Sequence, residues 1–154
     1  EIINVFEQTP RVRTLCGFEE GIDKIDWSNS RKGVVDVALL AADLTAGRAI
    51  ASVASISLSG NMITGATNIG YSDAKYDLDL SGIIAFGEAA AILKTLTSID
   101  LSNCGIAAKG IAEVARFMSA NTSLTKVVIT GAEISETDVA TLRAAAPNGC
   151  EVVW

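Results

Sequence analysis

The chain has 154 residues, of which 49% are apolar, 19% charged and 5% aromatic. A chain of this length can bury a core of Ile, Leu, Val and Ala as one domain or one short repeat array, without disulfides or metals. The formal charge of −6 is spread evenly and includes no basic stripe, which argues against nucleic acid or an anionic membrane surface as a partner. No apolar run reaches the roughly 18 residues that a membrane-spanning helix needs, so we expect no direct membrane insertion.

The three cysteines, Cys16, Cys104 and Cys150, are too few and too scattered for a disulfide framework. Their odd number and the absence of Cys-x-x-Cys favour reduced, packed thiols in an intracellular, reducing compartment, either the cytoplasm or an organelle interior. A single disulfide in an oxidising compartment is the alternative. The sequence begins at Glu1 rather than Met, so a targeting segment can have been removed.

Residues 1–21 precede the first regular pattern and contain an apolar cluster, Ile2, Ile3, Val5 and Phe6, before Pro10. We expect this segment to cap the open end of the first structural unit, because a repeat array needs its terminal apolar face covered. The alternative is an arm that docks on another protein.

Four stretches share one spacing of apolar residues, at relative positions 1, 4, 6 and 11, with Asn or Cys at position 9. Leu96–Ile106 and Val53–Ile63 follow it fully, Leu124–Ile134 has Ala at position 9, and Ile22–Ser30 keeps only the first half. Each stretch predicts a short strand whose alternate side chains point away from the core.

Position 9 of this pattern is expected to be structural. Burial of the amide of Asn61 is tolerable only if it bonds to backbone groups of the bend. Cys104 holds the same position and is expected to be a small packed thiol. We therefore expect Leu96, Ile99, Leu101, Cys104 and Ile106 all to be buried.

Helical spacing follows each predicted strand. The expected helix starts are Gly33, Gly82, Gly110 and Ser135. Gly47 is a plausible end for the first helix, and Ser135 with Asp138 resembles a capping box. Glu151–Trp154 is predicted to be a final strand whose Trp154 covers the last helix.

This alternation resembles leucine-rich repeats of the ribonuclease-inhibitor-like subtype, in the short form found in protists and algae. Gly110–Leu124 follows the helical half of that repeat closely. The resemblance implies an α/β fold: a short leucine-rich-repeat solenoid of about four repeats plus terminal caps, with a parallel concave sheet and outer helices. It implies one domain over residues 1–154, with an N-terminal cap or arm at 1–21, repeats at 22–146 and a C-terminal cap strand at 147–154.

The same resemblance implies protein recognition by outward strand residues at positions 2, 3, 5 and 7. The candidate contact residues of the first, third and fourth repeats are Asp23, Lys24, Asp26, Thr97, Ser98, Asp100, Ser102, Thr125 and Lys126. The second repeat offers only Ala and Ser there, and no large aromatic anchor stands in the middle repeats, so this face alone is a weak candidate.

An insertion breaks the repeat spacing near residues 64–81 and holds both tyrosines of the chain. Long surface loops often carry function, and exposed tyrosine beside charge is typical of a contact site. The candidate contact residues are Tyr71, Asp73, Tyr76 and Asp77. A solvated loop without function is the alternative; the ligand spacing of a calcium loop is missing. We expect deletion of Asn68–Asp79 to leave the fold intact.

The chain contains no histidine, which removes the usual general base and imidazole ligands, and no phosphate-binding loop motif occurs. We therefore expect no catalysis, no metal and no cofactor. The predicted function is a non-catalytic protein–protein interaction module or scaffold subunit of a multi-subunit complex. The alternative is a regulator of a partner enzyme, such as an inhibitor or a GTPase-activating-type module.

Overall fold

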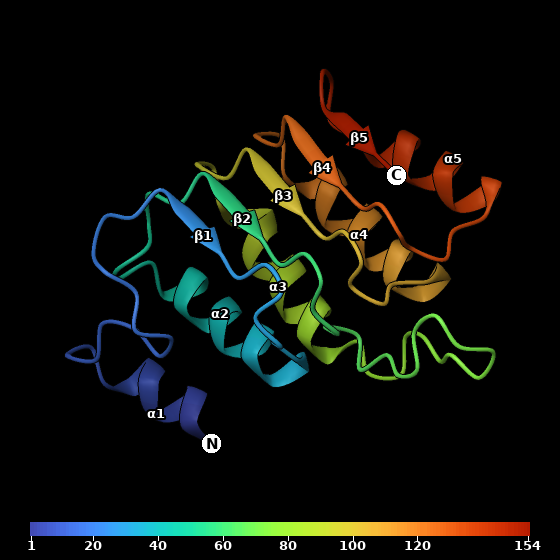
Figure 1. Cartoon of the computed structure of the whole chain (residues 1–154). Coiled ribbons are helices and arrows are strands. Elements are labelled where there is room, and N and C mark those ends of the chain that lie inside the picture. Colours follow the sequence, from blue (N-terminus) through green and yellow to red (C-terminus); the bar gives the residue numbers. More distant parts are fainter.

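The computed structural model describes residues 1–154, which form one parallel sheet of five strands and five helices (Figure 1). The sheet has the order β1-β2-β3-β4-β5, so each strand pairs with its neighbour in the chain. In chain order the elements are α1 (Ile2–Gln8), β1 (Lys24–Asp26), α2 (Val34–Ala46), β2 (Ser55–Ser57), α3 (Ser81–Ile92), β3 (Ser98–Asp100), α4 (Ala108–Ala120), β4 (Lys126–Val128), α5 (Glu136–Ala145) and β5 (Glu151–Val153). The α/β class and the single parallel sheet are confirmed.

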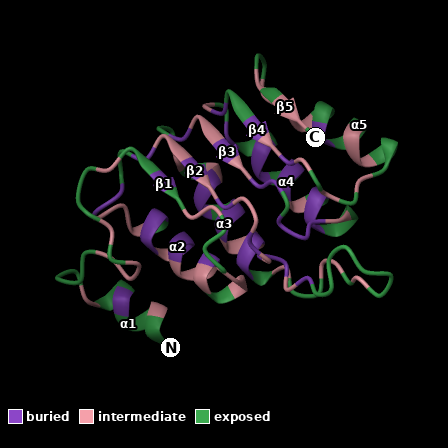
Figure 2. Ribbon diagram, viewed as in Figure 1, coloured by how far each residue is buried: buried purple, intermediate pink, exposed green.

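The core lies between the sheet and one layer of helices. The middle residues of the first four strands stand in register and are all buried; they are Ile25, Ile56, Ile99 and Val127. Residues on either side of them are exposed or half-buried. Figure 2 shows the buried faces of α2, α3 and α4 turned toward the strands, and these three helices pack against one another in sequence. The opposite face of the sheet therefore carries no helix.

The stretch Leu96–Ile106 has the burial that its pattern predicts. Leu96, Ile99, Leu101, Cys104 and Ile106 are all buried in one apolar cluster with residues of the neighbouring units. The first and last pattern stretches contribute fewer buried side chains; Trp27 and Ile134 are half-buried.

Two predicted helix starts are slightly wrong. The helix α2 follows Gly33 and ends at Gly47 in the left-handed conformation, as expected. The helices α3 and α4, however, begin before Gly82 and Gly110. A Cβ atom on Gly82 would lie 2.6 Å from the Val34 carbonyl oxygen, and one on Gly110 would lie 2.8 Å from Asp77 Oδ1. These glycines therefore allow close packing within the first helical turn.

The N-terminal segment contains a helix in which only part of the apolar cluster is buried. Ile2–Gln8 forms the helix α1, which the sequence did not predict, and only Phe6 is buried. Ile2 is 62% exposed and Val5 is 58% exposed, although α1 packs mainly against α2. Of the apolar cluster, Phe6 is therefore buried, whereas Ile2 and Val5 leave most of their side chains exposed.

The C-terminal strand is confirmed as β5, which pairs with β4 and forms one edge of the sheet. The guanidinium of Arg143 on α5 stacks 4.7 Å from the centroid of the Trp154 ring, so this tryptophan does lie against the last helix. No helix of the protein is both long enough and apolar enough to cross a membrane.

Candidate functional site

The face of the sheet that no helix covers is here called the outer sheet face. Register places its side chains in two rows across the strands. The first row is Lys24, Ser55, Ser98, Lys126 and Glu151, and the second is Asp26, Ser57, Asp100, Val128 and Val153. Because strand side chains alternate between faces, all ten point away from the core, and all are exposed or half-buried.

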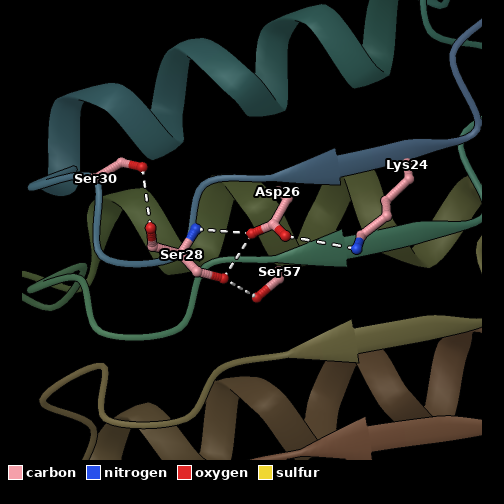
Figure 3. A network of polar contacts seen from close by, with 5 residues as sticks. All are labelled: Lys24, Asp26, Ser28, Ser30 and Ser57. Atoms are coloured by element: carbon pink, nitrogen blue, oxygen red, sulfur yellow. Dashed lines mark hydrogen bonds and ion pairs between the residues drawn. The ribbon is translucent and has the colours of Figure 1, made fainter.

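A polar network orders the β1 end of this face (Figure 3). Asp26 Oδ1 accepts hydrogen bonds from the Ser28 amide at 3.1 Å and from Ser28 Oγ at 2.6 Å. Ser28 Oγ also lies 2.8 Å from Ser57 Oγ on the next strand, and Lys24 Nζ lies 3.5 Å from Asp26 Oδ2. The Ser28 hydrogen bonds, followed by the Lys24 charge, lower the pKa of Asp26. Its carboxylate is therefore ionised and held in one orientation.

The same Asp-x-Ser arrangement recurs after β3. Asp100 Oδ1 accepts from the Ser102 amide at 2.9 Å and from Ser102 Oγ at 2.6 Å. Ser102 is only 6% exposed, so its predicted place among the outward contact residues is wrong. Asp100 itself has no ion-pair partner, which leaves one uncompensated carboxylate near the middle of the outer sheet face.

The remaining predicted strand residues fall into two groups. Thr97 Oγ1 and Thr125 Oγ1 each donate to a carbonyl oxygen of the preceding unit at 3.1 Å, so these hydroxyls support the sheet. Lys126 Nζ pairs with Glu151 Oε2 at 3.2 Å. Ser98 and Asp23 make no side-chain hydrogen bond within the chain. The face thus carries the Lys24–Asp26 pair, serines and Asp100 on β1–β3, and the Lys126–Glu151 pair with two valines on β4–β5.

The insertion between β2 and α3 is folded and fixed at its base. Thr64 is fully buried, and its Oγ1 donates to the Gly105 carbonyl oxygen at 2.5 Å. Thr67 and Lys75 form an antiparallel bridge with two backbone hydrogen bonds of 2.9 and 3.0 Å. The segment 67–75 is therefore a small hairpin rather than an open loop.

Two of the four residues predicted to contact a partner from this insertion bind the chain itself. The Asp77 carboxylate accepts from the Ala107 amide at 3.1 Å and from the Gly110 amide at 2.9 Å, which are donors of the first turn of α4. The Tyr76 hydroxyl donates to Glu133 Oε1 at 3.2 Å, and desolvation together with this carboxylate raises the pKa of Tyr76. Both residues attach the insertion to the two following strand–helix units.

The other two residues stand at the hairpin tip. Tyr71 is 75% exposed and Ile69 is partly exposed beside it. Asp73 Oδ2 accepts from Asn68 Nδ2 at 2.7 Å, and the Tyr71 amide donates to the Asn68 carbonyl oxygen at 3.0 Å. The tip therefore presents a large aromatic side chain on an ordered turn.

Two charged residues that the sequence patterns did not select organise the N-terminal segment. Buried Asp43 on α2 accepts from Thr14 Oγ1 at 2.6 Å and from the Leu15 and Cys16 amides at 2.7 and 2.9 Å. Arg48 donates to the carbonyl oxygens of residues 6, 7, 9 and 12 and stacks 4.4 Å from the Phe6 ring centroid. The sequence feature that could have indicated this role is the carboxylate of Asp43, which stands within the apolar run of α2.

The predictions for position 9 are confirmed. Asn61 is buried; its Nδ2 donates to the Trp27 and Leu58 carbonyl oxygens at 2.7 Å each, and its Oδ1 accepts from the Lys32 amide at 2.8 Å. Cys104 Sγ donates to the Leu58 carbonyl oxygen at 3.1 Å, and burial raises the pKa of this thiol to about 12. All three cysteines are unpaired.

No protein-family model matches the chain, and no curated protein matches it either. No group of three or more His, Cys, Asp or Glu side chains stands close enough together to hold a metal ion. The hairpin tip and the outer sheet face both present solvent-accessible side chains on a backbone that hydrogen bonds hold in place.

Proposed function

We propose that this protein is a non-catalytic protein-binding module: a short leucine-rich-repeat solenoid of the ribonuclease-inhibitor-like type that serves as a subunit of a larger assembly. The observation that carries the proposal is the exposed Tyr71 on a hairpin whose base is fixed by Thr64 and Asp77. An aromatic residue on a backbone that is ordered before binding loses less conformational entropy in a complex, and tyrosine is among the residues that most often dominate binding energy.

The outer sheet face supports the proposal as a second contact surface. Its strands stand in register, so side chains from successive units form continuous rows. Hydrogen bonds already orient Asp26 and Asp100, and Asp100 has no cationic neighbour within ion-pair distance. A partner that offers a basic group there gains charge complementarity.

The unpaired state of the three cysteine thiols supports a reducing compartment for the protein.

The anchoring role of Asp77 decides how the loop must be tested. Deletion of Asn68–Asp79 removes the carboxylate that caps α4, so a loss of binding after that deletion has two explanations. Deletion of 69–74 removes the tip, and the single change Tyr71→Ala removes only its aromatic side chain. Both leave Asp77 in place.

The experiment is recovery of a co-purifying partner with the wild type, Tyr71→Ala and a matched control, Val35→Ala. Val35 is also apolar and 72% exposed, but it lies on α2. We expect Tyr71→Ala to lose the partner at an unchanged urea midpoint, and Val35→Ala to retain it. Equal recovery with all three proteins would remove the hairpin tip from the proposal.

A further inference from the structure

The loop between α5 and β5 contains the one asparagine of the chain that is followed by glycine. Asn148 and Gly149 are both exposed, and Figure 1 shows this loop projecting beyond the amino end of β5. The Cys150 amide donates to the Pro147 carbonyl oxygen at 2.9 Å, which closes a turn. Gly149 has a φ of 81° within that turn, a conformation that favours glycine.

The groups of Asn148 and Gly149 that can react with each other are both free. The side-chain amide of Asn148 makes no hydrogen bond within the chain, and the Gly149 amide donates none. A Cβ atom built on Gly149 would meet nothing within 4 Å, so the space around the turn is open. Because glycine also lets the backbone rotate most freely, the Gly149 nitrogen can approach the carbonyl carbon of the Asn148 side chain.

The other asparagines lack this combination. Asn61 and Asn121 are buried, and their side-chain amides donate to backbone carbonyl oxygens. The other exposed asparagines each precede a residue with a Cβ atom, which crowds the backbone nitrogen that would have to attack. They are Asn4, Asn29, Asn68 and Asn103.

The exposure of Asn148 does not depend on its unit standing at the edge of the sheet. Asn148 lies three residues before β5, and the residues three before β2, β3 and β4 are Ser52, Thr95 and Ser123. Each of these belongs to a strand that has a further strand beyond it, and each is nevertheless exposed or half-buried. This position therefore stays at the surface when a following unit is present.

We propose that Asn148 is a site of spontaneous deamidation, with water as the co-reactant. The Gly149 nitrogen attacks Cγ of Asn148 and forms a cyclic imide, while Nδ2 takes up the proton that Gly149 loses and leaves as ammonia. Water then opens the ring. Opening at Cγ gives aspartate, whereas opening at the main-chain carbonyl carbon gives isoaspartate, in which the main chain runs through Cβ and Cγ.

Both products change the loop that leads into β5. Each adds a negative charge at residue 148, and isoaspartate also lengthens the main chain between α5 and β5. The hydrogen bond between Cys150 and Pro147 spans the altered residue, so isoaspartate should open the turn and loosen β5. This modification is independent of the proposed binding function, because it uses neither the hairpin tip nor a partner.

The test is incubation of the full chain at mildly alkaline pH in water labelled with the heavy oxygen isotope, followed by peptide mass spectrometry. We expect the peptide with Asn148 to exchange its amide NH₂ for a hydroxyl that carries the label, roughly tenfold or more faster than any other asparagine. Electron-transfer fragmentation identifies isoaspartate in that peptide. Hydrogen exchange of the aged protein should accelerate in Glu151–Val153, while amides of β2 and β3 keep their protection.

Gly149→Ala and Gly21→Ala form a matched pair of variants. Both glycines have a positive φ and open space around a Cβ atom, so the two changes strain the backbone alike, and circular dichroism checks that both variants fold. Gly149→Ala should slow the reaction at Asn148 roughly tenfold or more, and Gly21→Ala should leave it unchanged.

A rate at Asn148 no higher than at the other exposed asparagines would overturn the proposal. So would an equal rate in Gly149→Ala and the wild type. Unchanged exchange in β5 of protein that contains isoaspartate would overturn the effect on the sheet.

Discussion

At the scale of single residues, Asn61 ties two strand–helix units together through three hydrogen bonds. Its amide nitrogen bonds the carbonyl oxygens of Trp27 and Leu58, and its amide oxygen bonds the Lys32 amide. Trp27 and Lys32 belong to the preceding unit, so the side chain supplies the backbone bonds that the bend between strand and helix lacks.

Asn61→Ala should therefore destabilise the fold strongly. The change leaves two carbonyl oxygens and one amide without their partner in a buried bend, and each such group costs about 1–3 kcal/mol if it stays dry. We expect the free energy of unfolding in urea to fall by at least about 2 kcal/mol. Asn4→Ala, on the exposed side of α1, is the control and should change it by less than about 0.5 kcal/mol. A similar loss for both variants would contradict the role of Asn61.

The buried thiols predict a loss of stability at alkaline pH. Burial raises the pKa of Cys104 to about 12, and burial together with Asp43 raises the pKa of Cys16 to about 12, from 9.0. The folded chain therefore keeps protons that the unfolded chain releases above about pH 9, and stability falls as the pH rises from there toward 12.

The measurement is the urea midpoint at about pH 8 and about pH 11. We expect a decrease for the wild type and a clearly smaller decrease for a Cys16→Ala/Cys104→Ala variant. If both proteins lose the same amount, the alkaline loss comes from other groups and the thiols are not responsible.

At the scale of elements, polar side chains on α2 and just after it bind the backbone of the N-terminal segment, beside the buried Phe6 ring. Asp43 and Arg48 together bind backbone groups from residue 6 to residue 16, whereas Ile2 and Val5 of α1 remain exposed. The N-terminal segment should therefore detach without unfolding the sheet when these contacts are lost.

Arg48→Ala tests this arrangement. Amide hydrogen exchange should accelerate in residues 2–16, by roughly tenfold or more, while amides of β2 to β4 keep their protection. Arg11→Ala removes an exposed arginine from the same segment and should change neither region. Unchanged exchange in residues 2–16 of the Arg48 variant would show that Asp43 and Phe6 suffice to hold the segment.

The insertion acts as an external cap for α4. The N-cap residue of that helix, Ala107, has no side-chain acceptor, and Asp77 supplies one from the insertion. Asp77→Ala should lower the free energy of unfolding by about 0.5–2 kcal/mol, the usual value of an N-cap. Asp73→Ala, at the hairpin tip, is the matched control and should have little effect. Equal urea midpoints for the two variants would contradict the capping role.

The features that could be predicted from the sequence are those that depend on residues close together in the chain. The pattern in Leu96–Ile106 and the capping pair Ser135 and Asp138 operate within a dozen residues, and both are confirmed. The roles of Asp43, Arg48 and Asp77 depend on partners 27 to 42 residues away, which no local pattern reveals. Ser102 was misplaced because its position in the pattern does not show that it turns back onto Asp100.

At the scale of the whole molecule, the surfaces available for binding are distinct from the surfaces that form the core. One face of the sheet is covered by helices, and the other is free. The hairpin tip projects from the insertion, while its base is bound to Gly105 and to the first turn of α4. In the proposed module, binding therefore uses surfaces that the core does not need, so a binding defect and a folding defect can be separated by mutation.

The most direct test of the proposed function is crosslinking mass spectrometry in native cell material that contains the wild type or Tyr71→Ala. Exposed lysines report on different surfaces: Lys75 on the hairpin, Lys24 and Lys126 on the outer sheet face, and Lys94 after α3. We predict crosslinks from Lys75 to a different protein that are lost in Tyr71→Ala, while links within the chain are unchanged. Crosslinks to other proteins that arise only from Lys94, or that persist at Lys75 in Tyr71→Ala, would contradict this account.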